Sequence, residues 1–309
     1  MSTVEQIADA ILYEGYILYP YRASALKNGQ RWNFGVLYPP AYAAAQQGSD
    51  MSVMQCECLV RGSGLSVTVR FLQLVTRDGG WQEAMVRDVE VHALGVHSFA
   101  FPEQEIRENG VARRQERVEG SIEVSRSGAD RDWSRATVRI ANTTAYAGAN
   151  AANWAAREAA LRHSLVSTHA ILRAPGGEFA SLLDPPTELR ELAAGCSNMG
   201  LWPVLAGEAT PADTMLASPI ILYDYPQIAP ESCGDLFDGT EIDEILALRI
   251  LTLSDTEKQE MRQTDDRARQ ILERTENMPA EHFLKLHGIL RGMRPAQQAG
   301  AVWDPEDTE

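Results

Sequence analysis

A series of short runs rich in β-branched side chains fills residues 53–144 and constrains the fold more than any other part of the chain. Within the runs, apolar and polar residues alternate over several positions, as they do along half-buried strands. Turn signals separate the runs at residues 61–64, 78–80 and 127–130. Successive strands with short connections predict an antiparallel sheet or sandwich instead of a doubly wound parallel sheet. The runs read MQCECLV, LSVTVRFLQLVTR, EAMVRDVEVHAL, GSIEVSRS and SRATVRIANTT.

Helical patterns lie on both sides of this series. Apolar residues recur at helical spacing across residues 3–13, where Thr3 and Gln6 form a capping-box pattern. Ser254 and Glu257 form a second capping box, and helices are expected from there, with breaks, to about residue 291. The charged piece 102–119 is expected to leave the sheet as an exposed excursion that is helical in part.

The residues between 146 and 253 mix both patterns. A helix is expected over 153–163, followed by strands over 165–175 and 178–184. Gly176 and Gly177 lie between these two strands, which predicts a hairpin. A short helix should begin after residues 184–187, where two prolines precede Thr187, and a strand should cover 202–208.

Together these patterns predict an α+β fold with a β-sandwich-like N-terminal half, a mixed α/β middle and a helical C-terminal region. The expected division of the chain is a β-rich domain with an N-terminal helix at 1–148, an α+β domain at 149–253, a helical extension at 254–295 and a flexible tail at 296–309.

Residues 218–253 form the densest stretch, in which aromatic side chains, prolines and carboxylates alternate. Its acids could hold a hard cation through oxygen ligands, although a helix that starts at Glu241 and is capped by Thr240 explains about half of them. The motif Tyr223-Asp224-Tyr225-Pro226 has no such local explanation. Periodicity leaves open whether residues 246–253 are helix or strand. The acids are Asp224, Glu231, Asp235, Asp238, Glu241, Asp243 and Glu244.

A second aromatic stretch, residues 15–40, surrounds a basic cluster of Arg22, Lys27 and Arg31. A guanidinium group stacked on rings such as that of Trp32 can fix a loop or hold an acidic group. Fixing the loop is the preferred interpretation, because aromatic rings bury large areas wherever they can.

Charge and composition restrict the class of partner. The formal net charge of −15 disfavours nucleic acid and anionic membranes, since phosphate binding requires a cationic field. No stretch approaches the roughly 20 apolar residues that span a bilayer, and the N-terminus carries acids where a secretory signal carries bases. We therefore expect a cytoplasmic protein without membrane insertion, in which the four cysteines are reduced thiols.

The common signatures of nucleotide-binding, metalloprotease and serine hydrolase sites do not occur in the sequence. Cys56 and Cys58 are weak metal candidates, since residues two apart on a strand point to one face, and His92 and His97 could add imidazoles. Closed zinc sites favour a wider cysteine spacing and four ligands, so buried, inert cysteines and structural histidines are the preferred interpretation. No catalytic residue and no cofactor are predicted.

Two segments carry a resemblance that covers nearly the whole chain: LYEGYILYPYRASALKNGQRWNFGVLYP near the start and SPIILYDYPQIAPESCGDLFDGTEIDEILALRILTLSDTEK. They resemble an uncharacterised family of bacterial proteins of this length, whose genes are associated with clusters that encode nickel-iron hydrogenases and their maturation factors. The resemblance implies an accessory role in assembling or serving a hydrogenase, and it identifies no catalytic residue.

The leading hypothesis is a non-enzymatic accessory protein that docks on a hydrogenase subunit or maturation factor. One alternative is a metal-dependent enzyme that uses thiols or the acids of residues 224–244, and another is a stable structural subunit of a larger complex. Homo-oligomerisation stays open. The residues expected to form the interaction surface are Arg22, Lys27, Arg31, Trp32, Tyr223, Asp224, Tyr225, Asp235 and Asp238.

Overall fold

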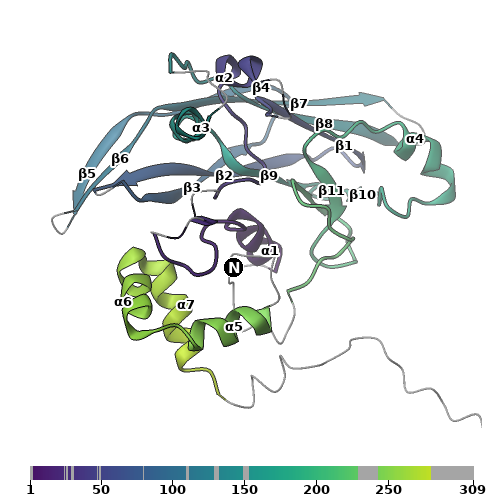
Figure 1. Cartoon of the computed structure of the whole chain (residues 1–309). Coiled ribbons are helices and arrows are strands. Elements are labelled where there is room, and N and C mark those ends of the chain that lie inside the picture. Colours follow the sequence, from purple (N-terminus) through teal and green to yellow (C-terminus); the bar gives the residue numbers. More distant parts are fainter. Residues whose placement is uncertain are drawn as a thin grey trace, which may run out of the picture.

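The computed structural model describes residues 3–23, 25, 27–28, 31–46, 48, 50–78, 80–108, 111–128, 132–148, 153–228 and 243–279. The fold is α+β, as the sequence predicts. Two antiparallel sheets stack on each other, and a layer of helices covers the outer face of one of them (Figure 1).

The first sheet has five strands in the order β10, β1, β8, β7, β4. Their bounds are Glu178–Phe179 for β10, Val53–Arg61 for β1, Trp133–Asn142 for β8, Val118–Gly128 for β7 and Gly95–Phe101 for β4.

The second sheet has seven strands in the order β11, β12, β9, β2, β6, β5, with β3 paired to β2. Their bounds are Trp202–Leu205 for β11, Thr214–Ser218 for β12, Val166–Arg173 for β9, Ser66–Arg77 for β2, Val111–Gln115 for β6, Gln104–Glu108 for β5 and Gln82–Val91 for β3.

The helices surround these sheets and cap their ends (Figure 1). They are α1 (Thr3–Leu12), α2 (Pro40–Ala45), α3 (Trp154–Leu161), the 3-10 turn η2 (Thr187–Leu189), α4 (Arg190–Ala194), α5 (Asp243–Leu251), α6 (Asp255–Thr264) and α7 (Asp266–Glu276). No helix in this described part of the chain is long and apolar enough to cross a membrane.

Strand β2 lies at the centre of the molecule because both of its faces are buried. Val69 and Phe71 belong to the core between the two sheets. Leu72 and Leu74 belong to a second core, formed with the aromatic residues of the N-terminal segment and with helices α5 to α7. A strand covered on both faces reads as a nearly continuous apolar run, which explains why alternation fades in the middle of β2.

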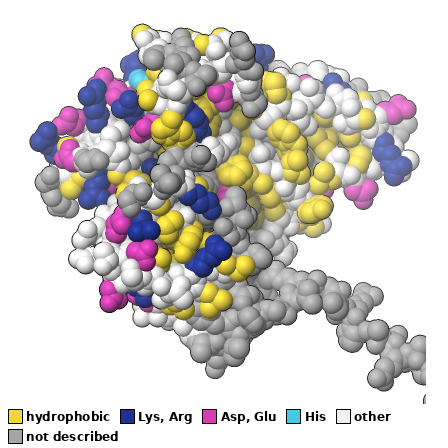
Figure 2. All heavy atoms as spheres, in the orientation of Figure 1, with side chains coloured by type: hydrophobic (Ala, Val, Ile, Leu, Met, Phe, Trp, Pro, Cys, Tyr) yellow, Lys and Arg dark blue, Asp and Glu magenta, His cyan; other side chains and the backbone are white. Residues whose placement is uncertain are grey.

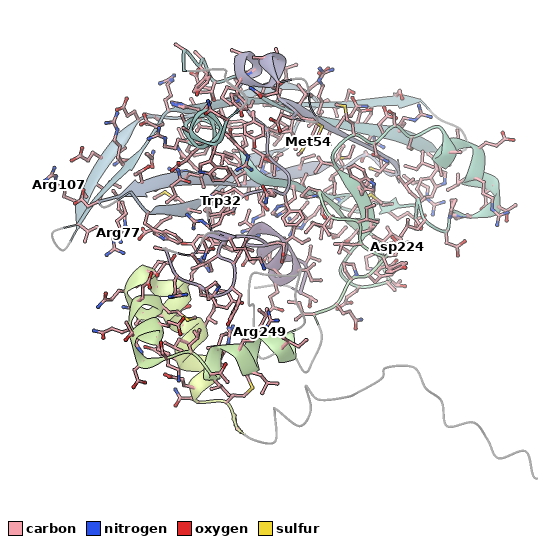
Figure 3. All side chains as sticks on the ribbon, in the orientation of Figure 1. Trp32, Met54, Arg77, Arg107, Asp224 and Arg249 are labelled. Carbon is pink, nitrogen blue, oxygen red and sulfur yellow. The ribbon has the colours of Figure 1, made fainter. Side chains whose placement is uncertain are left out.

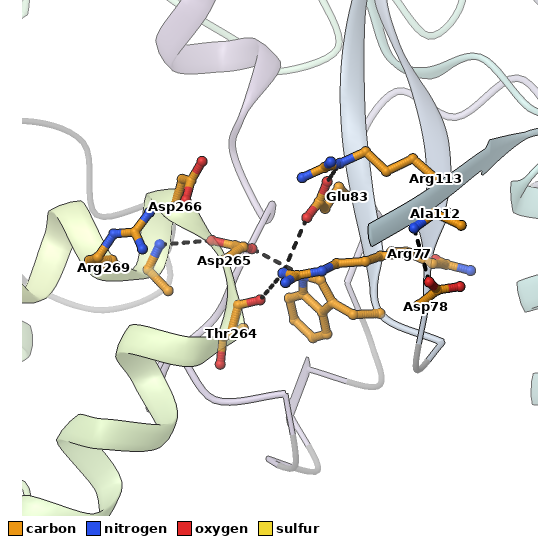
Figure 4. A network of polar contacts seen from close by, with 12 residues as sticks. Arg77, Asp78, Glu83, Ala112, Arg113, Thr264, Asp265, Asp266 and Arg269 are labelled. Atoms are coloured by element: carbon orange, nitrogen blue, oxygen red, sulfur yellow. Dashed lines mark hydrogen bonds and ion pairs between the residues drawn. The ribbon is translucent and has the colours of Figure 1, made fainter. Parts of the chain in front are cut away.

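Polar contacts fasten the helical layer to the sheet (Figure 4). The guanidinium of Arg77, at the end of β2, donates a hydrogen bond of 3.4 Å to the Thr264 carbonyl oxygen at the end of α6. Glu83 of β3 accepts from Arg113 of β6 at 2.8 Å and lies 3.6 Å from Arg77. These contacts join three strands to the C-terminal helices.

Several local predictions are confirmed. Helix α1 occupies Thr3–Leu12, and Ser254 and Glu257 form the predicted reciprocal capping box of α6. Helix α5 extends through Leu251, so the ambiguous residues 246–251 are helical. The predicted cap at Thr240 lies outside the described residues.

The prediction of partial helix in residues 102–119 is wrong. Strands β5 and β6 form an antiparallel hairpin there, and β6 pairs with the end of the long strand β2. The sequence carries a signal for this structure, because Asn109-Gly110 is a dipeptide favoured in two-residue hairpin loops. The high charge of the segment concealed its β pattern.

The hairpin predicted at Gly176 and Gly177 is also wrong. Strand β9 pairs with β2 and β12, whereas β10 pairs with β1. A Cβ atom on Gly177 would collide with the Arg61 carbonyl oxygen, so the glycine permits a close approach between two turns. Strands from both sides of the expected boundary at residue 148 therefore share each sheet.

Candidate functional site

The loop that follows β12, residues 219–228, contains the motif that the sequence left unexplained. Asp224 accepts hydrogen bonds from the Ser181 hydroxyl, at 2.5 Å, and from the backbone N–H of Leu205, at 2.8 Å. The backbone N–H of Tyr225 donates to the Leu205 carbonyl oxygen at 2.7 Å. Asp224, which is labelled in Figure 3, therefore fastens the loop to β11 and, through Ser181, to the segment after β10.

Tyr225 completes this attachment. Its φ angle is 55°, in the left-handed region that large side chains rarely adopt. This conformation accompanies the packing of the Tyr225 ring against the core between the sheets. Desolvation, followed by the nearby charge of Asp224, raises the pKa of its hydroxyl.

The fastened loop presents apolar side chains to solvent. Ile220 and Leu222 pack against the core beneath α1, whereas Ile221 and Tyr223 are 71% and 87% exposed. Hydrophobic side chains gather over the part of the molecule that contains β10 and β11 (Figure 2). We call the exposed apolar side chains of this loop the loop surface; they are Ile221, Tyr223 and Ile228.

Arg22 belongs to a different region from the loop surface. Its guanidinium lies 3.3 Å from Glu257 and 3.5 Å from Glu260, both on α6. It does not meet Asp224, whose described partners are Ser181 and Leu205. Arg22 thus attaches the N-terminal segment to the helical layer through two carboxylates of α6.

Arg31 and Trp32 lie inside the protein, 5% and 3% exposed. The Arg31 guanidinium carbon is 3.7 Å from the ring centroid of Trp81 and 4.9 Å from that of Trp32. The structure therefore separates the expected interaction residues into a buried cluster near α3 and an exposed loop after β12. Lys27 makes contacts within the protein, and Asp235 and Asp238 lie outside the described residues.

Cys56 and Cys58 point to the same face of β1, as predicted, and are fully buried in the core between the sheets. Burial raises the pKa of Cys56 to about 12 and raises that of Cys58 well above its usual value. Neutral thiols are poor nucleophiles and poor metal ligands. Among the residues that the structure describes, no group of three or more His, Cys, Asp or Glu side chains could hold a metal ion.

His92 and His97, the histidines considered as additional metal ligands, make local contacts. His92 lies 3.4 Å from Glu90, and the Nε2 atom of His97 lies 2.9 Å from the Ala93 carbonyl oxygen. Neither contact involves a cysteine. Of the seven acids between 224 and 244, Asp224 is the one with a described side chain.

Sequence reasoning missed the residues that surround these candidates. Ser181 and Leu205, which hold Asp224, come from other segments, and Trp81, Trp154 and Glu158 line one cavity together with Arg31. Local patterns could not reveal them, because each contact joins distant parts of the chain. No protein-family model matches this sequence, and no curated protein matches it.

Proposed function

We propose that this protein is a non-enzymatic accessory protein of nickel-iron hydrogenase assembly or maturation, which docks on a hydrogenase subunit or a maturation factor in the cytoplasm. The observation that carries the proposal is the loop surface, where Ile221 and Tyr223 project into solvent from a fastened backbone.

Two properties make this surface suitable for docking. Apolar side chains that stay exposed in a monomer commonly mark interaction sites, and tyrosine is enriched among the residues that dominate binding energy. The attachment of Asp224 to Ser181 and Leu205 holds the loop in place before binding, which reduces the entropy lost on association.

The resemblance of residues 12–39 and 218–258 to the hydrogenase-associated family supplies the class of partner. The net charge of −15 favours a neutral or basic surface on that partner and disfavours nucleic acid.

The test is affinity purification of the tagged full chain from hydrogen-oxidising cells, followed by mass spectrometry. The unmodified protein should recover a hydrogenase subunit or a maturation factor, and the double variant Ile221→Ala/Tyr223→Ala should recover at least about tenfold less. Leu94→Ala is the matched control, because Leu94 is 55% exposed but lies outside the loop surface. Recovery of neither class of protein, or equal recovery by the double variant, would contradict the proposal.

A further inference from the structure

A cavity of about 310 Å³ opens between residues 31–32, the start of β3 and helix α3. Its volume lies at the lower end of the roughly 300 to 1,000 Å³ that is usual for small-molecule sites. Three indole rings line it, from Trp32, Trp81 and Trp154. Trp154 is 44% exposed whereas Trp32 is buried, so the cavity runs from the surface to a buried floor.

The floor carries a buried cation, Arg31. Its guanidinium donates hydrogen bonds to the carbonyl oxygens of Tyr16, at 3.1 Å, and Gln82, at 3.0 Å. Within the described ranges, no carboxylate oxygen lies close enough to the Arg31 guanidinium, 4.0 Å or less, to form an ion pair with it. Desolvation lowers the pKa of Arg31 to about 10, which reflects the cost of holding this charge away from water.

The wall carries an anion, Glu158. It lies on α3 one helical turn after Trp154, so both side chains occupy one face of that helix. Its carboxylate accepts a long hydrogen bond of 3.4 Å from the Gln82 side chain, and no cation forms an ion pair with it in the part of the chain that is described. The carboxylates of Asp265 and, more weakly, Glu158 raise the pKa of Arg31 against the larger effect of desolvation, and both act from beyond the distance of an ion pair.

The backbone at Trp32 is strained and firmly held. Its φ angle is 64°, and a bulky residue in this left-handed region is a true outlier whose strain tends to accumulate at functional sites. Arg157 of α3 donates to the Trp32 carbonyl oxygen at 2.8 Å and to Asn33 Oδ1 at 2.9 Å. The cavity is thus shaped before any ligand enters.

We propose that this cavity binds a free α-amino acid with an aromatic or large aliphatic side chain. The carboxylate pairs with Arg31, the ammonium group pairs with Glu158, and the side chain lies against the indoles of Trp81 and Trp154. Such a ligand carries one group for each of the two charged side chains, Arg31 and Glu158, which form no ion pair with each other. Its apolar side chain matches the indole rings that line the cavity. The inference is independent of the proposed docking function, because the loop surface contains none of these residues.

The first experiment follows tryptophan fluorescence and melting temperature of the full chain with each standard L-α-amino acid. Apolar and aromatic amino acids should change both signals, with L-phenylalanine and L-leucine among them. N-acetyl-L-phenylalanine lacks the ammonium group and phenethylamine lacks the carboxylate, so each should bind at least about tenfold more weakly than L-phenylalanine. If no amino acid produces a response, or if acetate alone binds as well, the proposal is wrong.

Glu158→Gln provides the second experiment, since it removes the charge without breaking an ion pair. Calorimetric titration should show affinity for L-phenylalanine reduced at least about tenfold and affinity for N-acetyl-L-phenylalanine unchanged. Glu208→Gln is the matched control, on an exposed loop away from the cavity, and should bind as the unmodified protein does. Circular dichroism establishes that both variants fold. Equal affinity of Glu158→Gln for L-phenylalanine would overturn the assignment.

Discussion

The indole Nε1 of Trp81 donates a hydrogen bond of 3.1 Å to Oδ2 of Asp265. The Tyr16 hydroxyl donates to the same oxygen at 3.1 Å, and the other carboxylate oxygen accepts from the Ala268 N–H at 2.8 Å as the N-cap of α7. One side chain thus joins the N-terminal aromatic segment, the start of β3 and the C-terminal helices.

Replacement of Asp265 by alanine should therefore lower the free energy of unfolding by about 3 kcal/mol, because it removes a helix cap together with the carboxylate that accepts from the Tyr16 hydroxyl and the Trp81 indole. Urea denaturation followed by circular dichroism measures the change. Asp266→Ala is the control, since Asp266 is exposed and pairs with Arg269 on the surface of the same helix; its effect should stay within about 0.5 kcal/mol. Equal effects of the two variants would show that the Asp265 network contributes no stability.

Asp224 and Tyr223 are neighbours with different expected roles. Asp224→Ala should lower the free energy of unfolding by about 2 kcal/mol, because it removes the acceptor of the Leu205 N–H. Hydrogen exchange should report faster exchange of that amide. Tyr223→Ala should change stability by less than about 0.5 kcal/mol, since the side chain is 87% exposed, while it weakens docking. A stability loss for Tyr223→Ala as large as that for Asp224→Ala would argue against this division of roles.

Some local elements of this fold could be predicted from the sequence, because their signals lie within a few residues. The alternation in β1, the capping box at Ser254 and the spacing in α1 are of this kind. The pairing of strands could not be read in the same way. Strand β9 lies between β2 and β12 because its Ala170 and Leu172 complete the core between the sheets, and no local pattern encodes that position.

The candidate site was predictable to a smaller extent. The motif around Asp224 stands out in the sequence, but its role depends on Leu205 and Ser181, which are 19 and 43 positions away. The sequence predicts that Arg31 stacks on an aromatic ring, but the ring that lies nearest to it belongs to Trp81, on the turn between β2 and β3. Residue type indicates the kind of contact; the fold selects the partner.

The thiols of Cys56 and Cys58 should be unreactive in the native protein, because both are fully buried and burial raises the pKa of each. Alkylation by iodoacetamide at pH 8, read by peptide mass spectrometry, should leave both unmodified until urea unfolds the chain. Cys196 is the internal comparison, since it is partly exposed. Labelling of Cys56 or Cys58 at the rate of Cys196 would show that the core around β1 opens readily.

His169 should make stability fall in mild acid. Its side chain is fully buried on β9, its Nδ1–H donates to the Ser167 carbonyl oxygen at 3.0 Å, and its Nε2 has no hydrogen-bond partner in the described structure. Burial, reinforced by the positive charge of Arg70, lowers the pKa of His169 to about 4. The folded protein therefore keeps the ring neutral at pH values where the unfolded chain, with a pKa of about 6.5, already binds a proton.

Because the unfolded state binds more protons between these two pKa values, the contribution of His169 is complete above about pH 6.5 and declines as pH falls toward 4. Between pH 7 and pH 5 it should reduce the free energy of unfolding by about 2 kcal/mol. His169→Gln keeps a polar side chain that cannot titrate. Urea denaturation at both pH values should therefore show that the free energy of unfolding falls by about 2 kcal/mol less in this variant than in the unmodified protein. Because the carboxylates titrate in both proteins, their contribution to the pH dependence of stability cancels in the comparison with the unmodified protein. An identical loss in the two proteins would mean that His169 is protonated, or reaches water, in the folded state.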